Sequence, residues 1–332
     1  MPGGARRVLL AGATGTIGRA TARALRRHGH EVLALVRPLR DGSGPDEVRA
    51  RIPALDGCDI RSADVTDPAS LARDGLAGER VDAVISCLAS RTGAPADAWA
   101  VEHRAQGHLL AAATAAGARQ FVLLSAICVQ KPRLAFQHAK LAFERELAAS
   151  GIDYAIVRPT AFHKSLSGQV ERVRRGKPFL LFGDGTLTAC KPIDDDDLAE
   201  YLVGCLDDPV RRNRILPIGG PGPAQTPREQ GEALFALLGR APRFTRVPVA
   251  MMDAIIGVLG ALGRVAPPLA DKAEFARIGR YYATESMLVW DEARGRYDAN
   301  ATPETGTRTL LDYQARLLRG ERQDDRGQHA VF

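Results

Sequence analysis

The chain has 332 residues, with 45 Lys and Arg against 39 Asp and Glu, so it can form one dinucleotide-binding domain and a smaller additional region. Its net charge of +6 comes from scattered arginines with acids between them, which argues against a nucleic-acid partner and leaves an anionic ligand open. The five cysteines are widely spaced and include no CxxC pair, and the longest apolar stretch, residues 247–262, is interrupted by Pro248 and Asp253. These features argue against an iron–sulfur or zinc site and against a membrane span, and we expect a cytoplasmic protein without a secretory leader.

The first predicted element is an apolar strand at residues 8–11 that runs into a glycine turn with the spacing GxxGxxG. Gly12 suits a tight turn, Gly15 lets backbone amides approach a pyrophosphate, and Gly18 allows a helix to pack closely on the sheet. The helix is expected to begin near Thr16 and to end at residues 28–29, and its N-terminus would hold the diphosphate. A plain turn between strand and helix is the alternative. The predicted diphosphate loop comprises Gly12, Thr14, Gly15, Thr16, Ile17 and Gly18.

The second predicted strand, residues 31–37, ends on Arg37, with Arg40 close behind. NAD-binding folds usually carry an acidic residue here, which bonds the ribose 2′-hydroxyl and repels a 2′-phosphate. A guanidinium group suits a phosphate, so the sequence favours NADPH as the cofactor. A solvated surface arginine is the alternative.

Further short apolar runs at residues 58–65, 81–87, 120–125 and 154–158 are separated by helix-length segments, of which residues 97–116 are the clearest. This alternation predicts an α/β Rossmann fold with a doubly wound parallel sheet. Because ligands of such sheets bind at the carboxyl ends of the strands, further cofactor contacts are expected there. They are Asp64 and Val65 beside the adenine, then Leu88, Ala89, Pro159 and Thr160.

The regular alternation stops after the sixth predicted strand, past Pro159, where Gly and Pro become frequent. We therefore interpret residues 1–162 as the NADP-binding domain and residues 163–318 as a smaller C-terminal substrate-binding lid. A run at residues 214–219 is expected to return to the sheet as a strand. Residues 319–332 form a polar tail.

Residues 12–18, Asp64-Val65, Ser125 and residues 157–160 resemble the extended and atypical (NmrA-like) short-chain dehydrogenase/reductases. In that family a Ser polarises the substrate carbonyl, a Tyr donates a proton, and a Lys four residues later binds the nicotinamide ribose. Ser125 and Lys140 match these positions, and the resemblance implies that they are catalytic, but Phe136 stands in place of the tyrosine. A phenyl ring has no proton to give, so ordinary alcohol and ketone chemistry is not expected. An exposed helix lysine and a strand-end serine are the alternatives.

Four longer strings, residues 125–132, 158–169, 182–192 and 282–287, resemble the NADPH-dependent divinyl chlorophyllide a 8-vinyl-reductases. The resemblance implies hydride transfer from NADPH to the C8 vinyl group of a magnesium tetrapyrrole, in chlorophyll or bacteriochlorophyll synthesis. Such a reaction passes through a carbanion-like centre, not an alkoxide, which accounts for the missing tyrosine. The substrate contacts expected on this basis are Phe136, Phe162, His163, Lys164 and Tyr282. The proton donor stays open between Lys164, Tyr281, Tyr282 and water.

Two other functions compete with this interpretation. A non-catalytic NADP(H)-sensing or assembly protein of the NmrA-like type would also lack the catalytic tyrosine. A reductase of isoflavone-like or quinone substrates would share the fold and the cofactor, but should not share the strings at residues 190–192 and 282–287. The sequence does not indicate the oligomeric state.

Three further features can each be interpreted in more than one way. Asp194–Asp197 would suit a metal, but carboxylates at a helix start are more simply a cap, and no metal is expected. His163 is either an axial ligand of the substrate magnesium or a solvated loop residue. An apolar stripe could be core packing, a pocket lining or a surface peripheral to the photosynthetic membrane. It comprises Met251, Met252, Ile255, Ile256, Val258, Leu259 and Leu262.

Overall fold

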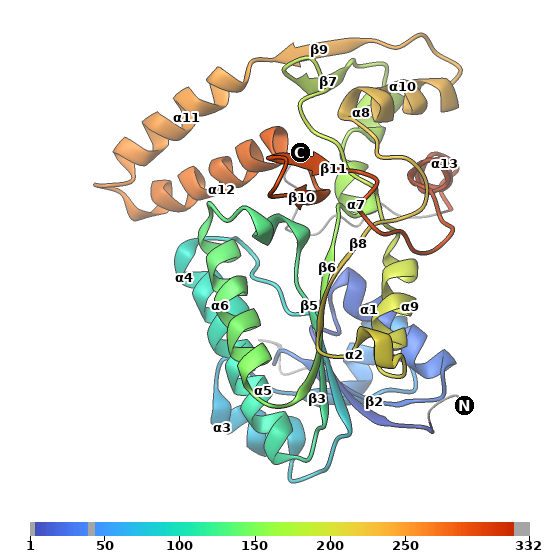
Figure 1. Ribbon diagram of the computed structural model, residues 1–332, viewed down its shortest axis with the longest axis vertical. Helices are drawn as coiled ribbons and strands as arrows, with labels where there is room; N and C mark the ends of the chain where they lie inside the picture. The colour runs from blue at the N-terminus through green and yellow to red at the C-terminus, as the bar shows by residue number, and fades with distance from the viewer. Residues whose placement is uncertain (1–3, 39–43, 322–332) are drawn as a thin grey trace.

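The computed structural model describes residues 4–38 and 44–321, and Arg40 lies outside this range. Its centre is a seven-stranded sheet in which every neighbouring pair of strands is parallel (Figure 1). The predicted doubly wound Rossmann fold is thereby confirmed. In sheet order the strands are β3 (Asp59–Ser62), β2 (Glu31–Val36), β1 (Arg7–Ala11), β4 (Ala83–Ser86), β5 (Gln120–Leu124), β6 (Asp153–Pro159) and β8 (Arg214–Ile218).

Helices cover both faces of this sheet (Figure 1). One face carries α1 (Thr16–Arg27), α2 (Pro45–Arg51) and α9 (Asp195–Gly204), and the other carries α3 (Pro68–Ser70), α4 (Pro95–Ala98), α5 (Gln106–Ala115) and α6 (Ala135–Ala149). Each face has its own apolar core because alternate residues of a strand point to opposite faces. Along β1, Leu10 packs on the α1 and α9 side, whereas Leu9 packs on the α5 and α6 side.

The helix predicted at residues 97–116 is not regular throughout. A π-helical stretch, Trp99–Ala105, joins α4 to α5. Glu102 lies in this stretch and is 3% exposed, next to the buried Val101. π-Helical insertions are frequent at functional sites because they reorient side chains within a helix.

Above the carboxyl edge of the sheet, the C-terminal half forms a small layer with its own apolar cluster (Figure 1). Phe179 and Phe244 pack edge to face in this cluster, which also holds Leu234 and Phe235. The elements of this layer are α7 (His163–Leu166), α8 (Val170–Arg174), β7 (Phe179–Phe182), α10 (Pro227–Leu237), β9 (Phe244–Val247) and α13 (Leu310–Leu318).

Two further helices, α11 (Val249–Leu262) and α12 (Pro267–Thr284), form a pair that projects to one side of the sheet (Figure 1). Ile278 and Tyr281 of α12 join Ile127, Cys128 and Phe136 in one buried cluster, so α12 is anchored on the Rossmann half. A two-stranded ribbon, β10 (Val289–Asp291) and β11 (Arg296–Asp298), follows α12.

Candidate cofactor and reaction site

The three glycines of the loop differ in how much space a side chain would have. Gly12 has a φ of 76°, and a Cβ placed on it would lie 2.5 Å from the carbonyl oxygen of Cys87. A Cβ on Gly18 would lie 2.1 Å from the carbonyl oxygen of Gly12, so α1 packs directly on the turn. A Cβ on Gly15 would meet the Gly12 oxygen at 3.4 Å, an ordinary contact. The fold therefore needs Gly12 and Gly18, while the space beside Gly15 suits an approaching phosphate.

Lys164 of α7 points to this loop. Its Nζ donates a hydrogen bond of 2.6 Å to Oγ1 of Thr16, the first residue of α1. A lysine ammonium and a helix N-terminus both favour anions. Lys164, which the sequence suggests as a substrate contact, is thus placed at the predicted diphosphate site. We call Gly12–Gly18 together with Lys164 the diphosphate end.

Arg37 lies exposed just after β2, on the side predicted for the adenine ribose. Asp64 follows β3, and its carboxylate accepts hydrogen bonds from the Thr66 hydroxyl at 2.7 Å and the Thr66 amide at 2.9 Å. These bonds and the nearby Arg37 lower the pKa of Asp64. Val65 is partly buried against the sheet. After β4, Leu88 is partly buried and Ala89 is exposed at the same edge.

The predicted ribose-binding lysine has a partner that sequence reasoning missed. Lys140 Nζ lies 2.7 Å from Oε2 of Glu102, and both side chains are largely buried. The other oxygen of Glu102 accepts hydrogen bonds from the Ser90 amide at 2.9 Å and the Ser90 hydroxyl at 3.1 Å. The exposed-lysine alternative is therefore wrong, because the ammonium is held at a fixed place. Glu102 could have been noticed as a charged residue in an otherwise buried row with Ala98, Ala105 and Leu109.

Ser125 is also engaged in a buried network. Its hydroxyl donates to Glu144, and the Arg158 guanidinium binds the same carboxylate. Ser125 is 5% exposed and Glu144 is 3% exposed. In this structure the hydroxyl proton of Ser125 is directed to a carboxylate, so the catalytic role of Ser125 stays a prediction.

The end of β6 is held by the segment before α9. The hydroxyl of Thr160 donates to the carbonyl of Lys191, and Thr160 is 4% exposed. Phe162 bridges to Ile193 and is partly buried. Pro159, the last residue of β6, lies at the predicted edge of the sheet. Because the Thr160 hydroxyl is already bonded to Lys191, a cofactor could contact Pro159 and Thr160 only through their remaining accessible atoms.

Phe136 and Tyr282 meet near Cys128. Phe136 is 8% exposed and packs in the cluster that anchors α12, so its contact with a pigment stays a prediction. The hydroxyl of Tyr282 lies 3.8 Å from Sγ of Cys128. Its neighbour Tyr281 instead directs its hydroxyl to the carbonyls of Cys128, at 2.9 Å, and Lys131, at 3.1 Å. We call Glu102, Cys128, Lys140 and Tyr282 together the reaction end.

His163 is placed differently from both sequence-based alternatives. It is 0% exposed, its Nδ1 lies 3.5 Å from Oδ2 of Asp194, and its ring packs edge to face on Tyr313. The solvated-loop alternative is therefore wrong. The structure gives the ring no surface at which to meet a pigment, because α13 and the start of α9 enclose it.

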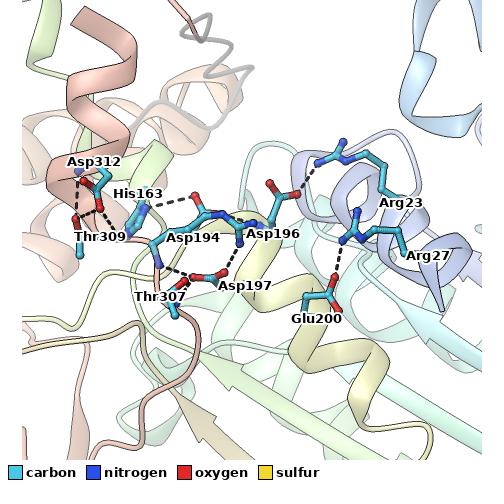
Figure 2. A network of polar contacts seen from close by, with 11 residues as sticks. Arg23, Arg27, His163, Asp194, Asp196, Asp197, Glu200, Thr307, Thr309 and Asp312 are labelled. Atoms are coloured by element: carbon cyan, nitrogen blue, oxygen red, sulfur yellow. Dashed lines mark hydrogen bonds and ion pairs between the residues drawn. The ribbon is translucent and has the colours of Figure 1, made fainter. Parts of the chain in front are cut away.

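The acidic run at the start of α9 is a structural junction (Figure 2). Asp194 caps the helix by accepting from the amide of Asp196 at 2.9 Å, and Asp196 pairs with Arg23 of α1 at 2.6 Å. Asp197 accepts from the amides of Thr307 and Arg308 at 3.0 and 2.9 Å. The carboxylates thus connect α1, α9 and the segment before α13. Among the described residues, no group of three or more His, Cys, Asp or Glu is arranged to hold a metal ion.

Two of the strings that carried the resemblance are neighbours in space. Cys190 forms a parallel bridge with Met287, and the amide of Met287 donates to the carbonyl of Ala189 at 3.0 Å. The amide of Ala189 in turn donates to the Ser286 hydroxyl at 3.0 Å. These strings therefore specify how the segment after β7 joins the end of α12, which carries Tyr282.

Comparisons with known proteins agree with this geometry. Residues 12–209 match the NAD(P)H-binding family. The chain is 52% identical to "Divinyl chlorophyllide a 8-vinyl-reductase, chloroplastic" of Oryza sativa subsp. indica over 98% of this chain and 82% of the relative. It is 27% identical to the photosystem II assembly factor Ycf39 of a Synechocystis strain over 74% of this chain and 72% of that protein.

Among solved structures, AtPrR2 with NADP+ and (+)pinoresinol superposes with a TM-score of 0.70 at 19% identity, over 94% of this chain and 99% of that one. This likeness supports the fold. The match to the rice enzyme, in contrast, extends over 98% of this chain at 52% identity. The chain belongs to the divinyl chlorophyllide a 8-vinyl-reductase family within the NAD(P)H-binding proteins.

Proposed function

We infer that this protein is an NADPH-dependent oxidoreductase that reduces the C8 vinyl group of divinyl chlorophyllide a, or a close precursor, to ethyl. The observation that carries this inference is the identity of 52% over 98% of the chain with the rice 8-vinyl-reductase. That identity is far above the level at which only a fold is shared. The product would be the monovinyl pigment of chlorophyll or bacteriochlorophyll synthesis.

The residues present fit NADPH, since Gly15 leaves room for a diphosphate and the cation of Lys164 stands beside it. The N-terminus of α1 and Lys164 would hold the diphosphate, and Arg37 the 2′-phosphate. Lys140, fixed by Glu102, would orient the nicotinamide ribose. When bound, NADPH supplies the hydride for the vinyl group.

The magnesium tetrapyrrole would lie between the carboxyl edge of the sheet and α12. This placement is supported by two partly exposed aromatic rings. Phe162 packs against the apolar core on the α1 and α9 side of the sheet, and Tyr282 packs against the cluster that anchors α12. A large, flat, largely apolar substrate favours aromatic side chains with few polar contacts. Ser125 and Phe136 are both largely buried, at 5% and 8% exposed.

The direct test is to incubate the purified protein with NADPH and divinyl chlorophyllide and to record the Soret band. A blue shift with matching oxidation of NADPH is expected from the wild-type protein, and none from Gly15→Val. Tight NADPH binding without any turnover would overturn the proposed function. That result would favour the non-catalytic sensing or assembly role, to which the resemblance with the Synechocystis assembly factor points.

We also propose that the protein binds peripherally to the photosynthetic membrane through α11. Within the described residues, no helix is long and apolar enough to cross a bilayer. The outward row of α11 is nevertheless apolar and exposed, with a spacing of three or four residues that places it on one face. This row comprises Met251 (49%), Ile255 (46%), Val258 (60%) and Leu262 (48%). Core packing, one of the sequence-based alternatives, is therefore wrong for these four side chains.

The occupant best suited to this face is an anionic lipid surface. The intervening residues Met252, Ile256 and Leu259 are less exposed, so α11 is apolar on both sides. Exposed Arg246 and Arg264 flank the helix and would meet lipid phosphates.

Flotation with vesicles containing anionic lipid tests this proposal. Val258→Glu should reduce vesicle binding at least about tenfold, because a charge would have to enter the apolar layer. Val210→Glu, at a 70% exposed position outside α11, serves as the matched control and should bind as the wild type does. Unchanged binding of Val258→Glu, or a dimer in solution that this substitution dissolves, would overturn the proposal.

A further inference from the structure

One phenol packs against the buried cluster that holds Phe136, the residue in place of the missing tyrosine, and it comes from α12. Tyr282 lies in the last turn of α12, and its hydroxyl is 3.8 Å from Sγ of Cys128, in the turn after β5. The charges of Glu102 and Lys140 act on this same pair, Glu102 on the phenol and Lys140 on the thiol. The polar groups of these two pairs come from four elements: the π-helical stretch, the turn after β5, α6 and α12.

The contacts of the other candidates leave them less suited to donate a proton. The single hydroxyl proton of Tyr281 is shared between the carbonyls of Cys128 and Lys131. The ammonium of Lys164 is bonded to Thr16 at the diphosphate end. Cys128 is 2% exposed, so its thiol cannot touch a large substrate, whereas Tyr282 is partly exposed.

We propose that Tyr282 is the proton donor of the vinyl reduction and replaces the tyrosine that Phe136 displaces on α6. This inference rests on the proposed function. Hydride addition forms one new C–H bond and breaks the vinyl π bond, whose electron pair passes to the adjacent carbon and the conjugated macrocycle. The Tyr282 hydroxyl gives its proton to that carbon and forms the second C–H bond. The phenolate then takes a proton from water, so the vinyl group has gained one hydride and one proton in total.

The surroundings of Tyr282 keep its phenol protonated before the reaction. Burial, with smaller contributions from Cys128, Tyr281 and Glu102, raises the pKa of the Tyr282 phenol well above its usual value. The group therefore carries its proton at neutral pH, as a general acid must before the reaction. The ammonium of Lys140, held by Glu102 at 2.7 Å, acts on the neighbouring Cys128 thiol, which lies 3.8 Å from the Tyr282 hydroxyl.

Tyr282→Phe tests the proposal, with Tyr281→Phe as the matched control. For Tyr282→Phe we expect kcat to fall by about 100-fold or more, the usual contribution of a positioned general acid. The dissociation constants of NADPH, from nicotinamide fluorescence, and of the pigment on the NADPH-free protein, from fluorescence quenching, should stay within about threefold. Tyr281→Phe should unfold at a lower temperature but retain kcat within about threefold below that temperature.

Two results would overturn the proposal while leaving the proposed function intact. One is wild-type kcat in Tyr282→Phe. The other is a higher pigment KM and dissociation constant with unchanged kcat, which would assign Tyr282 to binding alone. If Tyr282→Phe does not fold, Tyr282→His should restore part of the turnover with an activity profile shifted to lower pH, and an unshifted profile would count against the proposal. Absence of vinyl reduction by the wild-type protein would instead refute the proposed function itself.

Discussion

The diphosphate end and the reaction end differ in whether backbone or side chains form them. The diphosphate end is shaped mainly by backbone: Gly12 and Gly18 let the turn and α1 close on each other, and one cation, Lys164, reaches in. The reaction end is shaped by buried side-chain charges, and Lys140 is held by Glu102, which also binds Ser90. The diphosphate end depends on glycines, which have no side chain. The reaction end depends on buried side chains whose opposite charges neutralise one another.

This difference determines how each end responds to substitution. A binding site made of glycine backbone is disrupted by adding side-chain atoms. Where the added atoms meet no protein atom, only ligand binding is weakened and the fold is unaffected. A buried ion pair is damaged by removing one member, because the remaining charge loses its compensation. The following experiments test this contrast, beginning with the largest expected effect.

Gly15→Val should abolish measurable NADPH binding while leaving the protein folded. The backbone at Gly15 is extended, with φ −73° and ψ 166°, and a Cβ there makes only an ordinary contact, so the branched side chain would occupy the phosphate space. Gly18→Ala should instead destabilise the fold, by about 1–3 kcal/mol or more, since overpacking distorts the backbone. Fluorescence titration and urea unfolding separate the two effects. Tight NADPH binding by Gly15→Val would reduce the loop to a plain turn.

Lys140→Met should lower the free energy of unfolding by about 3–5 kcal/mol, because it leaves the Glu102 carboxylate buried without its cation. The double variant Lys140→Met/Glu102→Gln should recover most of that loss. Both variants should bind NADPH poorly, since the ribose contact is absent from each. Urea unfolding of Lys140→Met, Glu102→Gln and the double variant completes a double-mutant cycle. Strictly additive losses of unfolding free energy would show that the two residues are not coupled.

Arg37→Asp should weaken NADPH binding by about 1.5–3 kcal/mol, the contribution of a charge-assisted contact with the 2′-phosphate. Affinity for NADH should hold or improve, because a carboxylate accepts a hydrogen bond from a free 2′-hydroxyl. Arg145→Asp, an exposed charge reversal on α6, is the control and should change neither affinity. Unchanged NADPH affinity in Arg37→Asp would contradict the assignment of Arg37 to the 2′-phosphate.

Glu285→Gln should lower stability at neutral pH by about 1–2 kcal/mol, since the carboxylate accepts charge-assisted bonds. Burial alone would raise the pKa of Glu285, but the hydrogen bonds from Lys131 and Tyr297 outweigh it and lower the pKa. A lowered pKa in the fold means that this stabilisation is complete above about pH 4.5 and fades as the pH falls further. The unfolding temperatures of the wild type and of Glu285→Gln should therefore converge in acid. A constant difference at all pH values would show that the ionised Glu285 carboxylate is not the source of the stabilisation.

The diphosphate end of the site is easier to predict from sequence than the reaction end. The strands of the sheet and the helix from Thr16 follow from local patterns, because a GxxGxxG turn and buried apolar runs are compatible with few other structures. The pairing of Lys140 with Glu102 spans 38 positions in the sequence. It also depends on a π-helical stretch that no local sequence pattern predicts. The burial of His163 is hidden from sequence for the same reason, because it depends on α13, far along the chain.

The junction at Asp197 also bears on how this protein is made. Its carboxylate is satisfied by the amides of Thr307 and Arg308, and the end of β8 pairs with the same late segment through Gly219 and Glu304. During translation the sheet strands and α9 leave the ribosome about a hundred residues before these partners, an interval of roughly 5–20 s at ordinary elongation rates. Until then the acidic start of α9 lacks these partners, so a nascent chain stalled before residue 300 should be prone to capture by chaperones or proteases.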